Sequence, residues 1–264
     1  MKKFSLNKLV VALIIFLPIY FAVAALGTKF GLWGWQFSLG TLIVSGGPIL
    51  LGLTALVAVI ALIAALLRKP RKGWIVPVAG IVIPLAAFAM LATTGTTAEA
   101  NPIHDISTDT SNPPQFSAET MQAREQAGAN ALNDYQTPLG ETEMYSGAAP
   151  ELAIKSHAQI INETYADLAP LPLGGASQAD ALAAVAAAMA NMGFDDIRTD
   201  AQAGRVEGVA ETFWFGFKDD VVARVGENEI DFRSVSRVGQ SDLGANADRI
   251  AELRDAVSGQ IGQR

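Results

Sequence analysis

Long runs of apolar residues without a charged side chain occupy the first third of the chain. A helix needs roughly 20 apolar residues to cross about 30 Å of hydrocarbon. Three stretches meet this requirement, namely residues 9–26, 49–67 and 74 to about 92. Residues 37–45 are also apolar but are followed by Gly-Gly-Pro at 46–48, which favours an interfacial lead-in that extends the second span with a kink. The pattern therefore predicts three membrane-spanning helices.

The hydrophobic pattern changes after the third apolar stretch. Residues 101–116 are rich in Asn, Pro, Ser, Thr and Asp, which favours an extended, turn-rich segment. Residues 117–132 are polar and Ala-rich, as in a short surface helix, and the region that follows has no regular pattern up to residue 160. A helix is expected after Ser177, with Asp180 placed as in a capping box, and it ends at Gly193.

Four short segments rich in Val, Ile, Phe and Trp come next. They cover residues 196–199, 205–214, 220–225 and 229–238, and the short glycine-containing separators favour hairpins. From about Asp242, apolar residues recur at helical spacing, which predicts a last amphipathic helix. An antiparallel meander covered by helices gives a two-layer α+β domain.

The predicted fold class is accordingly an α-helical transmembrane anchor of three spans followed by an α+β domain in which helices cover an antiparallel sheet. We expect the anchor at residues 1–95, an extended linker with a His-Asp motif at 96–116, and an exported α+β domain at 117–264.

Charge divides the chain at the same boundary. Residues 1–100 contain eight Lys and Arg against one carboxylate, Glu99, for a net charge of +7. Residues 101–264 contain eleven Lys and Arg against twenty-five Asp and Glu, for a net charge of −14. An acidic domain repels phosphate backbones, so nucleic acid is not an expected partner. Cysteine is absent, which excludes disulfides and thiolate metal sites.

Basic residues also predict the orientation in the membrane. Three lysines precede the first span and four Lys and Arg lie at 68–72, whereas the connection 27–38 contains only Lys29. Short basic loops stay on the cytoplasmic side. The protein is therefore expected in the cell inner membrane, with a cytoplasmic N-terminus and a periplasmic C-terminal domain. An alternative treats residues 1–24 as a cleaved signal peptide, and it leaves the C-terminal domain on the same side.

None of the three spans contains Asp, Glu, Lys, Arg or His. Ion paths and proton relays need such groups inside the bilayer, so the membrane part is expected to act as an anchor in contact with lipid. The sequence also lacks a Gly-rich phosphate loop, a dinucleotide fingerprint and a His-Glu-x-x-His motif. No cofactor is expected.

Three motifs concentrate polar side chains in the second part of the chain. They are His104-Asp-Ile-Ser-Thr-Asp109 followed by Pro-Pro, Gly216-Phe-Lys-Asp-Asp220, and Arg233-Ser-Val-Ser-Arg-Val-Gly-Gln-Ser-Asp-Leu-Gly-Ala-Asn246, which continues to Ile250. With these motifs the chain resembles the bacterial family catalogued as domain of unknown function 1499, over residues 103–250. The resemblance implies an envelope-associated domain and implies no activity.

The motifs supply the candidate ligand-binding residues. Alternation along the last predicted strand places Asp231, Arg233 and Arg237 on one face, and Arg224 and Arg249 are expected near this face. Grouped guanidinium groups bind a phosphate or a carboxylate, or they are neutralised by nearby Asp side chains. The candidates are His104, Asp105, Asp109, Asp219, Asp220, Arg233, Arg237, Ser241, Asp242, Asn246 and Arg249.

Metal and acid–base sites are weaker hypotheses. His104, Asp105 and Asp109 supply one nitrogen and two oxygens, a weak candidate set for a divalent cation, although Asp and Thr also build turns without any ligand. Asp219 and Asp220 are adjacent on a strand and point to opposite faces, which makes a shared acid–base site awkward. His157 is expected at the surface.

The predicted function is a membrane-anchored, non-catalytic binding or interaction module of the cell envelope, with an envelope protein or an anionic small ligand as its partner. One alternative is a metal-assisted hydrolase that uses His104, Asp105 and Asp109. The other is a purely structural membrane scaffold, which predicts that the polar groups of the motifs are all paired internally.

Overall fold

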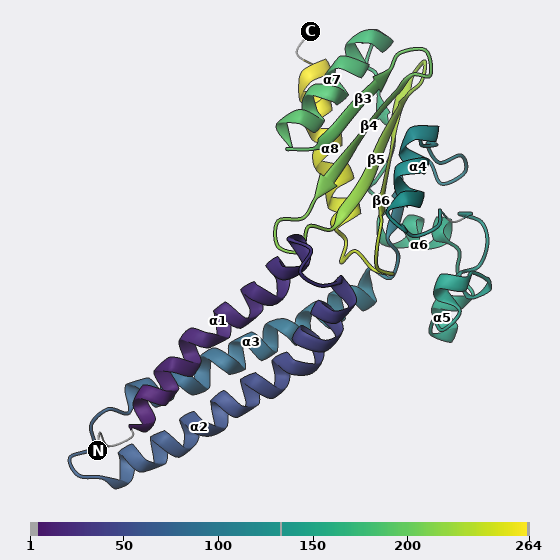
Figure 1. The fold of residues 1–264 in the computed structure, drawn as a ribbon. Coiled ribbons are helices and arrows are strands. Elements are labelled where there is room, and N and C mark those ends of the chain that lie inside the picture. Colours follow the sequence, from purple (N-terminus) through teal and green to yellow (C-terminus); the bar gives the residue numbers. More distant parts are fainter. Residues whose placement is uncertain (1–4, 133, 263–264) are drawn as a thin grey trace. The chain divides into compact units, whose positions relative to one another are not determined.

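The computed structural model describes residues 5–132 and 134–262 (Figure 1). Lys2 and Lys3, which contribute to the predicted orientation, lie outside these residues. The chain divides into two compact units. One comprises Met1–Thr96 with Phe213–Gly216, and the other comprises Thr97–Thr212 with Phe217–Arg264.

Three helices of the described residues are long and apolar enough to span a membrane, as predicted. The first is α1 (Leu6–Lys29), the second joins a π-helical segment (Phe37–Gly46) to α2 (Gly47–Leu67), and the third is α3 (Ile75–Ala100). The lead-in at 37–45 is thus helical and part of the second span. Pro48 is the second residue of α2, directly after the π-helical segment, and it has no N–H for a hydrogen bond to the preceding turn.

Small residues allow the membrane helices to pack closely. Val10, Ala58 and Ala61 are buried together between them. A Cβ atom on Gly80 would lie only 2.5 Å from Val10 Cγ1 and 2.8 Å from the Cβ of Ala58, so glycine is required at this point of α3. Close approach of backbones at small residues is the usual basis of helix association in lipid.

The second unit is built on an antiparallel sheet that has six strands within the described residues. The strands are β1 (Asp105–Ser107), β2 (Leu171–Pro172), β3 (Asp195–Asp200), β4 (Arg205–Glu211), β5 (Lys218–Val225) and β6 (Glu229–Ser236). Their order is β1-β6-β5-β4-β3, and β2 also pairs with β6. The predicted meander therefore corresponds to β3–β6, and β1 and β2 join it from distant parts of the chain.

The segment predicted as a linker, residues 96–116, is a structural part of the domain. Residues up to Ala100 continue α3, and β1 pairs with β6 in a register that places Asp105 opposite Val235. Ile103 and Ile106 are fully buried. The linker prediction is wrong for this segment. Its polar composition indicates turns, but local composition does not show that it pairs with a strand about 130 residues away.

Helices cover both faces of the sheet (Figure 1). The helices of the described part of this unit are α4 (Ala118–Gln126), α5 (Pro150–Ala153), α6 (His157–Thr164), α7 (Gln178–Asn191) and α8 (Ala245–Ile261), with single 3₁₀ turns at Leu139–Glu141 and Glu143–Tyr145. Of these, α5 packs on the turn Leu139–Glu141 and not on the sheet. The predicted capping residue of α7 is confirmed, because Ser177 Oγ accepts the amide of Asp180 at 3.1 Å. Residues 134–160, for which the sequence shows no regular pattern, contribute α5, the start of α6 and both 3₁₀ turns.

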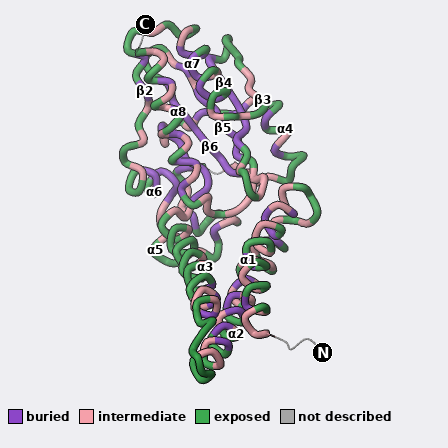
Figure 2. The backbone as a smooth tube through the Cα atoms, turned by 90° about the vertical axis from the view of Figure 1, so that its left-hand side faces the viewer, coloured by how far each residue is buried: buried purple, intermediate pink, exposed green. Residues whose placement is uncertain are grey.

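The main hydrophobic core lies between the sheet and the pair α7 and α8. It includes Met189 of α7, Phe232 of β6 and Leu253 of α8, all fully buried. A smaller cluster on the other face joins Phe116 to Val222 and Val235. Figure 2 shows the buried strands as the continuous purple centre of this unit. The predicted class, an antiparallel sheet covered by helices, is confirmed.

Candidate functional site

A buried ion pair joins the first and last motifs. Arg233 of β6 donates from Nε and Nη2 to the two carboxylate oxygens of Asp105, at 3.0 and 2.7 Å, and from Nη1 to the carbonyl of Pro114 at 3.2 Å. Its guanidinium carbon lies 5.7 Å from the ring centre of Phe116 and 5.1 Å from that of Tyr135. The Tyr135 hydroxyl also donates to Asp105. The side chains of Arg233 and Asp105 are only 3% and 0% exposed.

This pairing sets the charge state of both groups. Burial by itself raises the pKa of Asp105, but the charge and hydrogen bonds of Arg233, with the Tyr135 hydroxyl, bring that pKa below its ordinary value. Burial likewise opposes the charge of Arg233, and Asp105 beside it raises the pKa of the guanidinium above its ordinary value. The pair is therefore ionised and internally neutralised throughout the neutral range.

A second buried carboxylate, Asp220 of β5, holds two arginines on the same face of the sheet. Arg124 of α4 donates from Nη1 at 2.6 Å, and Arg237, which follows β6, donates from Nη2 and Nε at 2.7 and 3.0 Å. Asp220 is fully buried. The predicted clustering of Arg233 and Arg237 on one face is correct, but each guanidinium group is paired with a carboxylate.

The third group of motif residues lies on the opposite face, beneath α8. Arg249 binds Asp219 at 2.6 Å and donates to the Ser234 hydroxyl at 3.0 Å. Asn246 donates to the His104 carbonyl at 2.8 Å and to the Ser236 hydroxyl at 2.9 Å. The expectation that Arg249 lies near Arg233 is wrong, because the strand alternation that separates Asp219 from Asp220 also separates their partners.

The turn into α8 uses the remaining polar residues of the last motif. Asp242 accepts the amides of Gly244 and Asn246 at 2.8 and 2.7 Å, and Ser241 Oγ accepts the amide of Leu243 at 3.1 Å. The helix begins at Ala245, after Gly244 in a left-handed conformation with φ of 88°. Asp242 therefore accepts amides of the turn that leads into α8, and the helix begins a few residues later than the predicted start near Asp242.

The proposed metal ligands have separate partners. His104 Nδ1 lies 2.9 Å from the Tyr145 hydroxyl, Asp105 binds Arg233, and Asp109 binds Arg224 at 2.9 Å. Asp109 also accepts two amides of the turn that follows it. Within the described ranges, no group of three or more His, Asp or Glu side chains is arranged to hold a metal ion.

The structure reveals a buried histidine–tyrosine cluster that sequence reasoning missed. The His157 ring stacks on Tyr135 with ring centres 5.5 Å apart. It also packs edge to face with Tyr145, with ring centres 5.7 Å apart. Burial lowers the pKa of His104, and it lowers the pKa of His157 to about 4. The predicted surface position of His157 is wrong. His157 is the first residue of α6, between the capping-box residues Ser156 and Gln159, and only tertiary packing buries this end of the helix.

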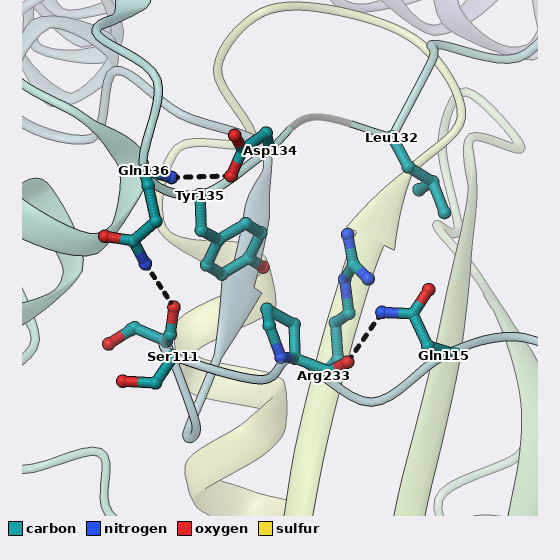
Figure 3. A pocket seen from close by; sticks show the side chains of 9 residues that line it. Ser111, Gln115, Leu132, Asp134, Tyr135, Gln136 and Arg233 are labelled. Carbon is teal, nitrogen blue, oxygen red and sulfur yellow. Dashed lines mark hydrogen bonds between the residues drawn. The ribbon is translucent and has the colours of Figure 1, made fainter.

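One pocket of about 290 Å³ opens beside the Asp105–Arg233 pair (Figure 3). Figure 3 shows the Arg233 guanidinium and the Tyr135 ring side by side at this pocket, with the side chains of Gln115 and Gln136 toward its rim. The lining residues are Thr110, Ser111, Pro113, Gln115, Leu132, Asp134, Tyr135, Gln136 and Arg233. Of the residues predicted as ligand-binding, Arg233 is in this lining. The sequence analysis did not identify the other lining residues, because the segments 110–115 and 132–136 meet only in the folded domain. Pro113-Pro114 did indicate a turn after the first motif.

The fold and this arrangement define a class of protein: a chain with three helices long and apolar enough to span a membrane, and a helix-covered antiparallel sheet whose charged motif residues pair with one another. The chain belongs to the family described as protein of unknown function (DUF1499), whose model matches residues 105–257. The resemblance seen in the motifs is therefore confirmed. Searches of curated proteins and of solved structures find no match to the chain.

Proposed function

We propose that this protein is a membrane-anchored, non-catalytic binding module whose ligand site is the pocket beside Arg233. The pocket itself carries the proposal, since Arg233 and Tyr135, which both bind the buried carboxylate of Asp105, are among its lining residues. Small-molecule sites are typically concave and contain a few polar groups held in fixed positions. The chain offers such groups here.

The polar groups of the pocket are held by their own hydrogen bonds. Gln136 Nε2 donates to the Thr110 carbonyl at 2.9 Å, and the Gln136 amide donates to Asp134 at 2.9 Å. Gln115 Nε2 donates to the Pro113 carbonyl at 2.8 Å. Side chains ordered before binding lose less conformational entropy when a ligand arrives. This supports recognition by a pre-organised rim.

The charges of the pocket favour an uncharged ligand over an anionic one. Arg233 is neutralised by Asp105, and the exposed carboxylate of Asp134 adds negative charge to the lining. An anion would therefore meet little net attraction. A small hydroxyl- or amide-bearing molecule matches the side-chain amides and the Ser111 hydroxyl, and we propose this class of ligand in place of the anion expected from sequence.

Burial of the acid–base groups supports a non-catalytic role. A general acid or base has to come within hydrogen-bond reach of the substrate. His104, Asp105 and His157 are each 0% exposed, and Asp105 is committed to Arg233 and Tyr135. The hydrolase alternative receives no support from this arrangement.

The ligand site is tested on the full-length chain in detergent micelles, with N-acetylglucosamine as the uncharged probe and inorganic phosphate as the anionic comparison. Saturation-transfer NMR should show saturable binding of N-acetylglucosamine, and Gln136→Ala should weaken it roughly tenfold by removing one amide contact. Gln122→Ala, an exposed glutamine of α4 outside the pocket, is the matched control and should bind like the unaltered chain. Absence of saturable binding, or equal weakening in both variants, would contradict the proposal.

A structural scaffold is the second candidate, because the charged motif side chains form closed pairs. Arg233, Arg237 and Arg249 each bind a buried carboxylate, as that alternative predicts. The same binding experiment separates the two candidates, since a scaffold requires no pocket ligand.

We further propose that the chain lies in the cell inner membrane, with its N-terminus in the cytoplasm and its second unit in the periplasm. The distribution of basic residues supports this orientation: four Lys and Arg lie at 68–72, whereas the end of α1 and its connection to the second span contain Lys29 alone. An alkaline phosphatase fused after Arg264 should be active, and a green fluorescent protein at the same position should be dark. The reverse pair of signals would place the domain in the cytoplasm.

A further inference from the structure

The turn between β4 and β5 is unusually aromatic. Four of its six residues, 212–217, are Phe or Trp. The turn is closed by a hydrogen bond from the Thr212 amide to the Phe217 carbonyl at 2.8 Å and by one from the Phe217 amide to Thr212 Oγ1 at 2.9 Å. Gly216, with φ of 66°, supplies the left-handed residue that the turn requires. The aromatic side chains are thus carried on a defined loop.

Two of these side chains extend into solvent. Phe213 is 71% exposed and Trp214 is 53% exposed, and their rings meet edge to face with centres 5.2 Å apart. Lys218, the first residue of β5, is also exposed and lies 3.9 Å from Glu211 at the end of β4. Exposed aromatic clusters on a soluble surface mark contacts with a membrane or another protein.

The amino-acid composition of this loop favours lipid as its binding partner. Trp has an apolar ring body with one polar N–H, so Trp and flanking Lys side chains favour the headgroup layer of a bilayer. The relevant bilayer is the one that anchors the chain, since its three apolar helices are each long enough to span a membrane. Only four residues, 101–104, separate the end of α3 from β1, and four residues extend over at most about 14 Å. The covalent connection between the last apolar helix and the sheet is therefore short.

We propose that the 212–217 loop inserts Phe213 and Trp214 into the headgroup region of the membrane in which the chain is anchored. This gives the loop between β4 and β5 a lipid contact in addition to the covalent connection between α3 and β1. The inference is independent of the pocket ligand, because none of the pocket-lining residues belongs to this loop.

The test uses Trp214 as its own reporter in the full-length chain. In the variant Trp33→Phe, Trp35→Phe, Trp74→Phe, Trp214 is the remaining indole. The matched control carries these changes with Trp214→Phe and Glu227→Trp, which moves the indole to the turn between β5 and β6 at the other end of β5. Both chains are placed in nanodiscs of phosphatidylcholine, with or without bromine on the acyl chains near the headgroup.

We expect brominated lipid to reduce Trp214 fluorescence roughly twofold while leaving the fluorescence of the Glu227→Trp control nearly unchanged, because quenching requires contact with the brominated chains. A Trp214 signal that is blue-shifted but not quenched would indicate a protein partner and overturn the proposal, and equal quenching at both positions would overturn it too. Because the chain has no cysteine, a nitroxide on Phe213→Cys provides a second measurement that leaves the membrane tryptophans intact. Its accessibility should be high to oxygen and low to a water-soluble nickel complex, and the reverse order would contradict lipid insertion.

Discussion

Replacement of Asp105 by Asn is expected to lower the free energy of unfolding of the second unit by about 3–5 kcal/mol, the usual effect of removing one partner of a buried ion pair. Asparagine keeps the size of the side chain but removes the charge that balances Arg233. The guanidinium, 3% exposed and enclosed by Phe116 and Tyr135, would then lie in the protein interior without a counterion. Its pKa is too high for it to become neutral instead. The measurement is the urea concentration at the midpoint of unfolding, determined by pulse proteolysis on the full-length chain in detergent micelles.

Asp109→Asn is the matched control. Asp109 also lies on the first motif and binds an arginine of the sheet, but its side chain is 27% exposed, and its partner Arg224 keeps a second carboxylate, Asp231, at 2.7 Å. Loss of such a partly exposed pair is expected to cost under about 1 kcal/mol. Equal losses in Asp105→Asn and Asp109→Asn would show that burial of the Asp105–Arg233 pair does not govern its contribution.

Mild acid is expected to destabilise the second unit through His157. The ordinary pKa of histidine is 6.5, and burial lowers that of folded His157 to about 4. Between these values the unfolded chain binds a proton that the folded chain excludes, so the free energy of unfolding falls as the pH falls from 6.5 to 4. At pH 5 the expected loss from this group is about 2 kcal/mol relative to neutral pH.

The surroundings of His157 support this direction. The positive charge of Arg233 and the neighbouring His104 also lower its pKa, whereas Asp105 and the more distant Asp134 oppose the shift without cancelling it. The rings packed on it, Tyr135 and Tyr145, have pKa values raised by burial and stay neutral in this range.

His157→Phe removes the titrating group while keeping an aromatic ring between Tyr135 and Tyr145. The urea midpoint of each full-length chain is measured at pH 7 and at pH 5. The loss of stability between these pH values should be smaller in the variant than in the unaltered chain, by about 2 kcal/mol. The pKa of His104 is also lowered by burial, so a smaller dependence should remain. An identical pH dependence in both chains would exclude His157 as its source.

Local sequence pattern was sufficient for the elements whose signals lie within a few residues. The three spans follow from uncharged apolar runs of sufficient length, and strands β3–β6 follow from apolar segments divided by short glycine turns. Strand alternation alone placed Asp219 and Asp220 on opposite faces, and the structure agrees. These features depend on helical or strand periodicity, which is a property of neighbouring residues.

Pairing between distant segments was decided only by the tertiary structure. Asp105 and Arg233 are 128 positions apart, and no periodicity indicates that β1 adds to the edge of β6 or that these two charges meet. The burial of His157 and the pocket walls likewise depend on where residues 134–160 pack. Sequence identified the polar motifs, but whether their charges face solvent or one another depends on which carboxylate the fold places beside each guanidinium, because an arginine is equally suited to a ligand and to a buried aspartate.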